Sequence, residues 1–165
     1  GSIKDLIKFE TELLEYLGFG DRKTYKYKKY DELKKYYKTH ELTHKHENRM
    51  LTDFGRVVFC QEFPSYTSPF WNMKKKGDKH AYKIDVILGG NETIGSAERS
   101  SSVKEMAREF YTISEGKYAQ KLFDLFGKDR VEKELSEFLS LDFFPRVGGG
   151  IGLTRLMDAF NSMQQ

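Results

Sequence analysis

The sequence predicts an α+β domain in which an antiparallel β-sheet is flanked by helices over one face. Strand-like apolar runs at 57–64, 81–88 and 92–99 predict the sheet, and a Gly-Gly-Asn turn joins the last two as a hairpin. Helical spacing of apolar residues at 3–17 and across 103–139 predicts the helices. A glycine-rich strand then leads into a last helix, whose apolar face is predicted to comprise Leu153, Leu156, Met157 and Phe160.

Composition limits the class of protein. A chain of 165 residues with 15% aromatic residues is one domain or part of one, and is long enough to bury a core. Its 28 Lys and Arg against 25 Asp and Glu leave a net charge of +3, which excludes the strongly basic surface of a nucleic-acid-coating protein. The single cysteine, Cys60, excludes an internal disulfide and fits a reducing compartment.

The sequence shows no targeting feature. There is no run of about 18 apolar residues and no apolar h-region at the N-terminus, so we expect neither a membrane span nor a signal peptide. A cytoplasmic location is the corresponding expectation. Gly1-Ser2 is typical of an expression scar, so the natural domain is expected to occupy residues 3–165.

The N-terminal part begins with a predicted amphipathic helix over residues 3–17. Residues 23–30 are rich in lysine and tyrosine. Such a stretch can hold a nucleic-acid backbone and stack on bases, but a solvated strand or loop face is commoner. Asp31 is expected to cap a short helix that runs through Lys38.

Three histidines, His40, His44 and His46, lie near one another in the sequence beside Glu47. Histidines four residues apart on a helix can bind zinc, and Glu47 could add a ligand. The spacing is not the His-Glu-x-x-His of metalloproteases, and the run is strongly polar. A surface loop is therefore the main expectation, with a metal site as the alternative.

The hairpin at 81–99 concentrates acidic, hydroxyl and guanidinium groups. Alternation along its second strand would place Glu92 and Ser96 on one face, and Gly95 and Arg99 on the other. Glu92 and Arg99 can then serve one ligand only if a twist or bulge near Gly95-Ser96 breaks the alternation. The alternative is a surface hairpin with scattered charges.

Four glycines in five positions, Gly148, Gly149, Gly150 and Gly152, lie directly before the last helix. Glycine lets a ligand approach the backbone closely and a helix N-terminus favours anions, so the run predicts a nucleotide or phosphate site. The Gly-Lys-Ser/Thr of a P-loop is absent, and the elements that follow a dinucleotide fingerprint are absent too. The alternative is a glycine strand packed under a helix, with Arg155 merely solvated.

The segment Gly148-Gly149-Gly150-Ile151-Gly152-Leu153-Thr154-Arg155-Leu156 resembles the third signature motif of class II aminoacyl-tRNA synthetases. It is closest to the aspartyl, asparaginyl and lysyl branch and to its relative, ammonia-dependent asparagine synthetase. The resemblance implies that the four glycines lie under the adenine and ribose of ATP. It also implies that Arg155 is catalytic and contacts the γ-phosphate, whose oxygen pairs suit a planar guanidinium.

A second resemblance to the aspartyl and asparaginyl enzymes lies earlier in the chain. Its segments are Phe63-Pro64, Pro69-Phe70-Trp71-Asn72-Met73-Lys74, Ile84-Asp85-Val86 and the strand 91–99. The family has the same seven-residue step from glutamate to arginine as Glu92 and Arg99. The resemblance implies that Glu92, with Asp85 as a weaker candidate, holds the Mg²⁺ of ATP through hard oxygen ligands. It implies that Arg99 binds the side chain of the amino acid substrate.

The chain also departs from the family pattern. The departures are Gly95 for serine, Glu98 for glutamine, Arg146 for histidine, Thr154 for glutamate, and a longer connection over residues 100–139. The first signature motif is missing, and so is the Phe-Arg-x-Glu hairpin of the second, which Phe54-Gly55-Arg56-Val57 does not supply. The resemblance therefore covers the C-terminal half of a catalytic domain.

Together the resemblances imply ATP-dependent activation of aspartate or asparagine as the adenylate, for tRNA aminoacylation, with ATP and Mg²⁺ as cofactors. This chain alone is expected to be inactive. The full-length parent is expected to be a homodimer that contacts tRNA through regions missing here. Two alternatives stay open: an amide-forming ligase like asparagine synthetase, and a non-catalytic binding or regulatory module.

Overall fold

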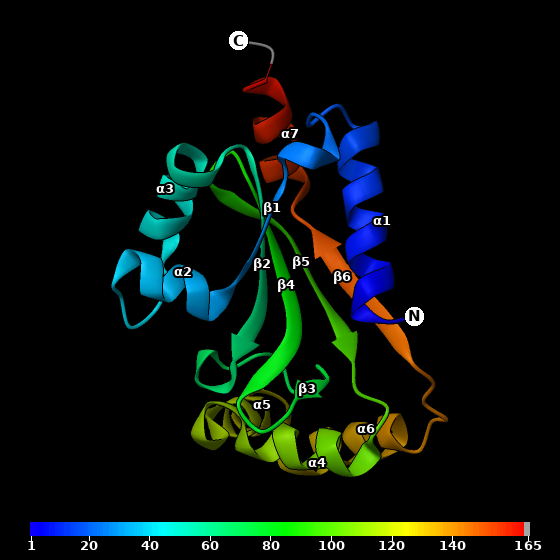
Figure 1. Ribbon diagram of the computed structural model, residues 1–165. Helices are drawn as coiled ribbons and strands as arrows, with labels where there is room; N and C mark the ends of the chain where they lie inside the picture. The colour runs from blue at the N-terminus through cyan, green and yellow to red at the C-terminus, as the bar shows by residue number, and fades with distance from the viewer. Residues whose placement is uncertain (164–165) are drawn as a thin grey trace.

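The centre of the fold is a β-sheet with the strand order β1-β2-β4-β5-β6, in which the short β3 pairs with β4 (Figure 1). The computed structural model describes residues 1–163. The strands are β1 Lys26–Lys29, β2 Val57–Pro64, β3 Lys75–Lys76, β4 His80–Leu88, β5 Asn91–Arg99 and β6 Arg146–Ile151. The pairings are antiparallel except for β1 with β2, which is parallel. The expected α+β class with an antiparallel sheet is confirmed, with one parallel pair added at the β1 edge.

Helices and short 3₁₀ turns connect the strands. The helices are α1 Ile3–Tyr16, α2 Tyr30–Tyr37, α3 His44–Phe54, α4 Val103–Thr112, α5 Lys117–Phe126, α6 Lys128–Leu139 and α7 Leu153–Asn161. The 3₁₀ turns are Arg22–Thr24, Ser65–Thr67 and Ile113–Gly116. Within residues 1–163, no helix has the length and apolar character that crossing a membrane requires.

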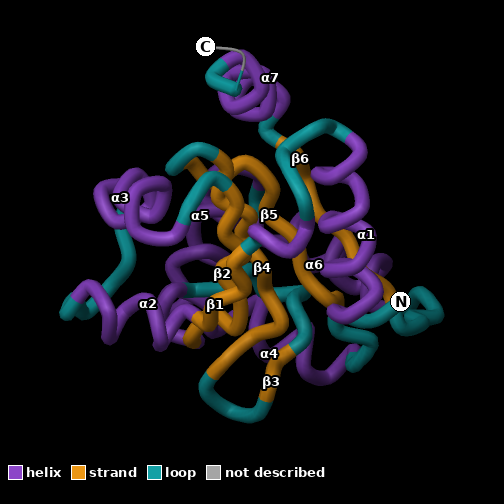
Figure 2. The backbone as a smooth tube through the Cα atoms, turned by 45° about the horizontal axis from the view of Figure 1, so that its top comes forward, coloured by secondary structure: helices purple, strands orange, loops and turns teal. Residues whose placement is uncertain are grey.

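The helices cover parts of both sheet faces, so the expectation of helices over one face is wrong. α1 packs on one face, while α2 and α3 pack on the other, over β1 and β2 (Figures 1 and 2). The reason lies in β2, whose run Val57-Val58-Phe59-Cys60 is buried throughout. An apolar strand without alternation must be covered on both sides.

The two main cores therefore lie on opposite sides of the same strands. The core under α1 contains Leu6, Leu14, Phe59, Val86 and Ile94 among others. The core under α2 and α3 contains Leu33, Met50, Val58, Cys60 and Ile87 among others.

Helix α1 begins with a capping box. The Asp5 N–H donates to the Ser2 hydroxyl, and the Ser2 N–H donates to the Asp5 carboxylate.

The connection between β5 and β6 folds as α4, α5 and α6 at one end of the sheet (Figure 1). These helices have a small core of their own, formed by Phe110, Ala119, Val131 and Leu135, with Trp71 packed against it. On the sheet face opposite α1, the register of β4, β5 and β6 places Asp85, Gly95, Arg99 and Gly150 together.

One local expectation needs correction. Asp31 is the second residue of α2 rather than its cap, because the helix begins at Tyr30 and the Glu32 carboxylate accepts the Lys29 N–H at 3.2 Å.

The lysine- and tyrosine-rich stretch contains β1, whose residues are mostly exposed, as the commoner expectation of a solvated strand face has it. Its rings differ in burial: Tyr25 and Tyr30 are buried, while Tyr27 is 41% exposed.

Candidate functional site

A β-bulge at Thr93 brings Glu92 and Arg99 to the same face of the sheet. Val86 pairs with Ile94 and Ile87 pairs with Glu92, which leaves Thr93 as the extra residue of β5. The bulge reverses the alternation on its N-terminal side, so Glu92 points to the face of Gly95 and Arg99. An ideal Cβ on Gly95 would lie 3.1 Å from Glu92 Oε1. The required bulge is present two residues before the expected place at Gly95-Ser96.

Small residues form a flat floor between these two charged side chains. In the sheet register Gly95 pairs with Gly150 and Ala97 pairs with Gly148, so all four share the face of Arg99. We call these four residues the glycine floor. A Cβ on Gly150 would meet no atom within 4 Å, so the space above it is open. A planar group can therefore approach the backbone here more closely than it could over larger side chains.

The other two predicted ATP-binding glycines, Gly149 and Gly152, are not part of the glycine floor. Gly149 points to the opposite face, where Ser96 lies directly against it. Gly152 precedes α7, and its N–H donates to the Thr93 carbonyl at 2.8 Å, which ties the start of the helix to the bulge. The structure thus places two of the four glycines on the floor and two where they shape the strand and helix.

Arg155 lies at one end of the glycine floor. It is in the first turn of α7, as predicted, and its Nη1 donates to the Glu92 carbonyl at 2.7 Å. The same nitrogen lies 4.0 Å from Glu92 Oε2. The side chain is still 60% exposed, so its other N–H groups are free to bind an anion.

Arg99 is held toward the other end of the floor. Nη1 donates to Asn72 Oδ1 at 3.0 Å, and Nη2 donates to the Gly148 carbonyl at 3.1 Å. Burial lowers the pKa of the half-buried Arg99 guanidinium, and the nearby charge of Arg146 lowers it further. Arginine nevertheless stays charged at physiological pH. The two acceptors fix the plane of the guanidinium, as recognition of a carboxylate or amide requires.

Asp85 lies beside Glu92 on the same face, paired with Gly95 in the sheet. Its side chain is 9% exposed, and its Oδ2 accepts a hydrogen bond from Lys83 Nζ. Its Oδ1 is buried, has no hydrogen-bond partner within residues 1–163, and would lie 3.6 Å from a Cβ on Gly95. Burial raises the pKa of Asp85 to about 6, with Lys83 opposing the rise and Glu92 adding to it.

The donor set fits a small divalent cation. Asp85 Oδ1 and Glu92 Oε1 converge on the space above Gly95, and both are the hard oxygens that Mg²⁺ prefers. An unpartnered buried carboxylate oxygen is costly unless a cation or donor satisfies it. Of the two expected metal-binding residues, Asp85 is the more buried and Glu92 the more accessible.

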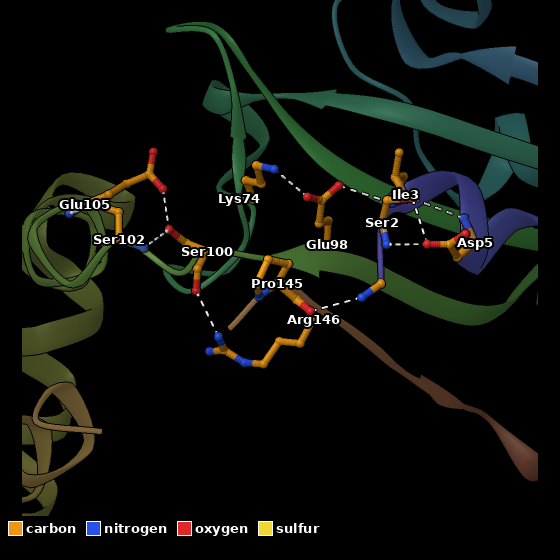
Figure 3. Close-up of polar contacts among 11 residues, drawn as sticks. Ser2, Ile3, Asp5, Lys74, Glu98, Ser100, Ser102, Glu105, Pro145 and Arg146 are labelled. Atoms are coloured by element: carbon orange, nitrogen blue, oxygen red, sulfur yellow. Dashed lines mark hydrogen bonds and ion pairs between the residues drawn. The ribbon is translucent and has the colours of Figure 1, made fainter. Parts of the chain in front are cut away.

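Two of the residues that depart from the family pattern have structural partners (Figure 3). Glu98 lies on the face of α1, where it accepts a hydrogen bond from Ile3 N at 3.1 Å and pairs with Lys74 at 2.5 Å. Arg146 donates to the Ser100 carbonyl at 3.1 Å. Its guanidinium also lies 4.5 Å from the centre of the Phe143 ring. Glu98 is therefore turned away from the glycine floor, and Arg146 is held by neighbouring chain segments.

The three histidines do not form one cluster. His44 begins α3 and lies 3.5 Å from Glu47, while His46 Nδ1 accepts the Thr43 N–H at 3.0 Å as part of the helix cap. His40 instead contacts the ring of Tyr66. Across residues 1–163, no group of three or more histidine, cysteine, aspartate or glutamate side chains could hold a metal ion. The expected surface loop at this place is wrong, since helix α3 begins within it.

Sequence reasoning missed two residues of this site. Asn72, which holds Arg99, lies in the segment that carries the family resemblance, but no pattern identifies its partner. Lys83 could be found from its position two residues before Asp85, which puts both on one strand face. A cavity of about 450 Å³, lined by Ser65, Lys75 and Glu109 among others, has none of the predicted site residues in its lining.

Comparison with known proteins agrees with this architecture. The sequence profile of the family described as tRNA synthetases class II (D, K and N) matches residues 3–165. No curated protein sequence matches the chain. Among solved structures, the asparaginyl-tRNA synthetase of Pyrococcus horikoshii matches with a TM-score of 0.73 and 16% identity, over 100% of this chain and 44% of that one.

Two further solved structures give the same result. The asparaginyl-tRNA synthetase of Entamoeba histolytica in complex with asparaginyl-adenylate has a TM-score of 0.71 and 17% identity, over 98% of this chain and 42% of that one. The aspartyl-tRNA synthetase of the same organism has a TM-score of 0.63 and 16% identity, over 84% of this chain and 29% of that one. At these identities the likeness establishes the fold, and the chain spans less than half the length of each of these proteins.

Proposed function

Because the chain belongs to the class II tRNA synthetases of the aspartate, lysine and asparagine group, we propose that it takes part in ATP-dependent activation of aspartate or asparagine as the adenylate. In this proposal residues 3–165 form the C-terminal half of the catalytic domain, and the activated amino acid is transferred to tRNA. One observation carries the proposal: the Thr93 bulge turns Glu92 to the face that holds Arg99 and the glycine floor.

Activation brings a carboxylate to the α-phosphorus of ATP, so two anions must meet in one site. Catalysis of such a step depends on positioning and on neutralising charge. In the proposal, the base and ribose of ATP lie over the backbone of Gly148, Gly149 and Gly150 in β6 and of Gly152 after it. Arg155 binds the γ-phosphate with the N–H groups that it does not use on Glu92. Arg99 binds the side chain of the amino acid at the other end of the floor.

Glu92 and Asp85 would hold Mg²⁺ together with the ATP phosphates. Bound there, the ion would neutralise phosphate charge and fix the polyphosphate chain. Glu92 also accepts Arg155 through its carbonyl, so one residue orients the phosphate-binding arginine and offers a carboxylate to the cation. The arrangement needs no general base, because the attacking carboxylate is already ionised.

The partners of the complete enzyme follow from the family and are part of the same proposal. The small-molecule partner is aspartate or asparagine. Contacts with tRNA, and assembly as a homodimer, are assigned to regions that the solved relatives have and this chain does not span. The arginine that binds the α-phosphate would come from the same regions.

The proposal is tested by two measurements. The chain should bind ATP with Mg²⁺ in isothermal titration, and Arg155→Ala should weaken that binding, while Arg130→Ala on the exposed face of α6 should not. The 165-residue chain should give no pyrophosphate exchange with aspartate or asparagine, whereas a protein that also carries an Arg-x-Glu hairpin should give it with one of them. Equal ATP binding by the wild type and Arg155→Ala would reject the assigned nucleotide site.

A further inference from the structure

Lys83 is a cation already bound to Asp85, one of the two acidic residues of the site. It lies on β4 two residues before Asp85, and its Nζ donates to Asp85 Oδ2. The side chain is 21% exposed and its ammonium lies 3.7 Å from the centre of the Phe63 ring. Contacts with a buried carboxylate and with a ring face hold the ammonium in place on two sides.

Each carboxylate of the acidic pair already has a cation beside it. Lys83 Nζ contacts Asp85, and Arg155 Nη1 lies 4.0 Å from Glu92 Oε2, while the charge of Arg99 lies at the other end of the floor. Affinity for a divalent cation rises with the number of ligating charges. Two carboxylates that each have a cation beside them therefore have little attraction for a free divalent cation, even though Asp85 Oδ1 has no partner among the described residues.

We propose that Lys83 controls the divalent-cation affinity of the Asp85–Glu92 pair, so that the cation binds only when a polyphosphate brings additional negative charge. The part of this proposal that concerns polyphosphate rests on the ATP site proposed above. The part that concerns Lys83 does not, because it predicts the behaviour of the chain without nucleotide. Lys83 acts through Asp85 and is a positioning residue rather than a catalytic one.

The consequence is ordered binding of ligand and metal. A site with free carboxylates would hold Mg²⁺ before ATP arrives. The ligands of the bound ion would then have to rearrange when the phosphates of ATP bind. With Lys83 in place, the ion enters together with the phosphates that complete its coordination. Mg²⁺ commonly binds through one or two carboxylates plus phosphate oxygens, which is the ligand set available here.

The test is Mn²⁺ binding to the purified chain at pH 8, followed by the electron paramagnetic resonance signal of free Mn²⁺. Without nucleotide, Lys83→Met should bind Mn²⁺ at least about tenfold more tightly than the wild type, because one uncompensated charge is added at the site. Glu92→Gln in the Lys83→Met background should abolish the gain. Lys74→Met is the matched control. It also removes a lysine that pairs with a buried carboxylate, but this carboxylate, Glu98, lies on the sheet face opposite the glycine floor, so Mn²⁺ affinity should not change.

Each outcome decides one part of the proposal. Equal Mn²⁺ affinity of the wild type and Lys83→Met, with both proteins folded by circular dichroism, would overturn the role of Lys83. An equal gain in Lys74→Met would overturn it too, since the effect would then be one of net charge. If Lys83→Met fails to fold, Lys83→Gln gives the same comparison with a side chain that keeps a donor. Because ATP itself binds Mn²⁺, the measurement with ATP is compared with ATP without protein. Wild-type protein and ATP together should lower the free-Mn²⁺ signal by more than the two lower it separately; a gain in Lys83→Met without this excess would reject only the proposed nucleotide site.

Discussion

Gly149 and Ser96 face each other across the β5–β6 pair so closely that a Cβ on Gly149 would lie 2.5 Å from the Ser96 Cβ. The same Cβ would lie 2.7 Å from the Gly95 carbonyl oxygen. Backbone atoms cannot move away as a flexible side chain can. Any larger residue at position 149 therefore has to separate the two strands that carry the site.

Gly149→Ala is expected to destabilise the fold, and Gly150→Ala is its matched control. The first should lower the free energy of unfolding by about 1–3 kcal/mol, the usual cost of overpacking. The second adds a methyl group in open space above the floor and should leave stability nearly unchanged. Urea unfolding of both variants measures the difference. Equal stability of the two would contradict the close packing of Gly149 against Ser96.

Gly150→Ala is expected to affect ligand binding instead. Its methyl group would project from the glycine floor, where the proposed site places ATP. Close backbone approach is lost when a Cβ is added. Isothermal titration should show weaker ATP binding by Gly150→Ala, at unchanged stability. Wild-type affinity in this variant would place the nucleotide elsewhere.

Arg155→Ala is expected to impair ATP use in the complete enzyme by about 2–4 kcal/mol, the range for loss of one charge-stabilising donor. The variant should fold normally, because the arginine is 60% exposed and contacts only Glu92 among its ion-pair and hydrogen-bond partners in residues 1–163. The dependence of pyrophosphate exchange on ATP concentration gives the measurement. An unchanged ATP dependence would leave Arg155 as a solvated helix residue.

Arg99→Lys is expected to raise the KM for the amino acid and to leave the KM for ATP unchanged. A lysine cannot reach Asn72 Oδ1 and the Gly148 carbonyl together while presenting a planar fork to the substrate. Hydrogen bonds to charged groups contribute about 1.5–3 kcal/mol, so the KM for the amino acid should rise about tenfold or more. Exchange assays that vary the amino acid and ATP separately distinguish the two effects. A raised KM for ATP alone would contradict the assignment of Arg99.

Glu10 is expected to make stability depend on pH. The residue lies in α1 and is 3% exposed, and its Oε2 has no hydrogen-bond partner in the part of the chain that the structure describes. Burial raises the pKa of Glu10 from 4.5 to about 7; the neighbouring Ser96 hydroxyl opposes the rise and the charge of Asp85 adds to it. A carboxyl with a raised pKa in the folded state contributes stability that is full below pH 4.5 and is lost as the pH rises through 7.

Glu10→Gln removes this ionisation. It should therefore raise the free energy of unfolding at pH 8 by about 1–3 kcal/mol, and less at pH 5, where the wild-type carboxyl is largely protonated. Urea unfolding at the two pH values provides the measurement. Glu12→Gln, on the exposed side of the same helix, is the control and should show no such difference. A stability gain equal at both pH values would contradict ionisation of Glu10 as the cause.

Much of the fold could be predicted from the sequence because the relevant signals are local. The apolar runs of β2 and β4, and the period near 3.6 of α1 and α4–α6, can be recognised from neighbouring residues alone. Helix α3 was missed because its residues His44–Phe54 are mostly polar and only Met50 is buried. Its position depends on packing against β2 rather than on a pattern of its own.

For the site, the sequence by itself determined which residues carry charge and where the glycines lie: Glu92, Arg99, the run 148–152 and Arg155. Only the tertiary structure decided that these residues meet, because the pairing of β5 with β6 joins positions about fifty residues apart and the Thr93 bulge reverses one side chain. Strand alternation alone predicts the opposite face for Glu92. The position of Lys83 two residues before Asp85 puts both on one strand face, whereas the burial of their ion pair is a property of the assembled sheet.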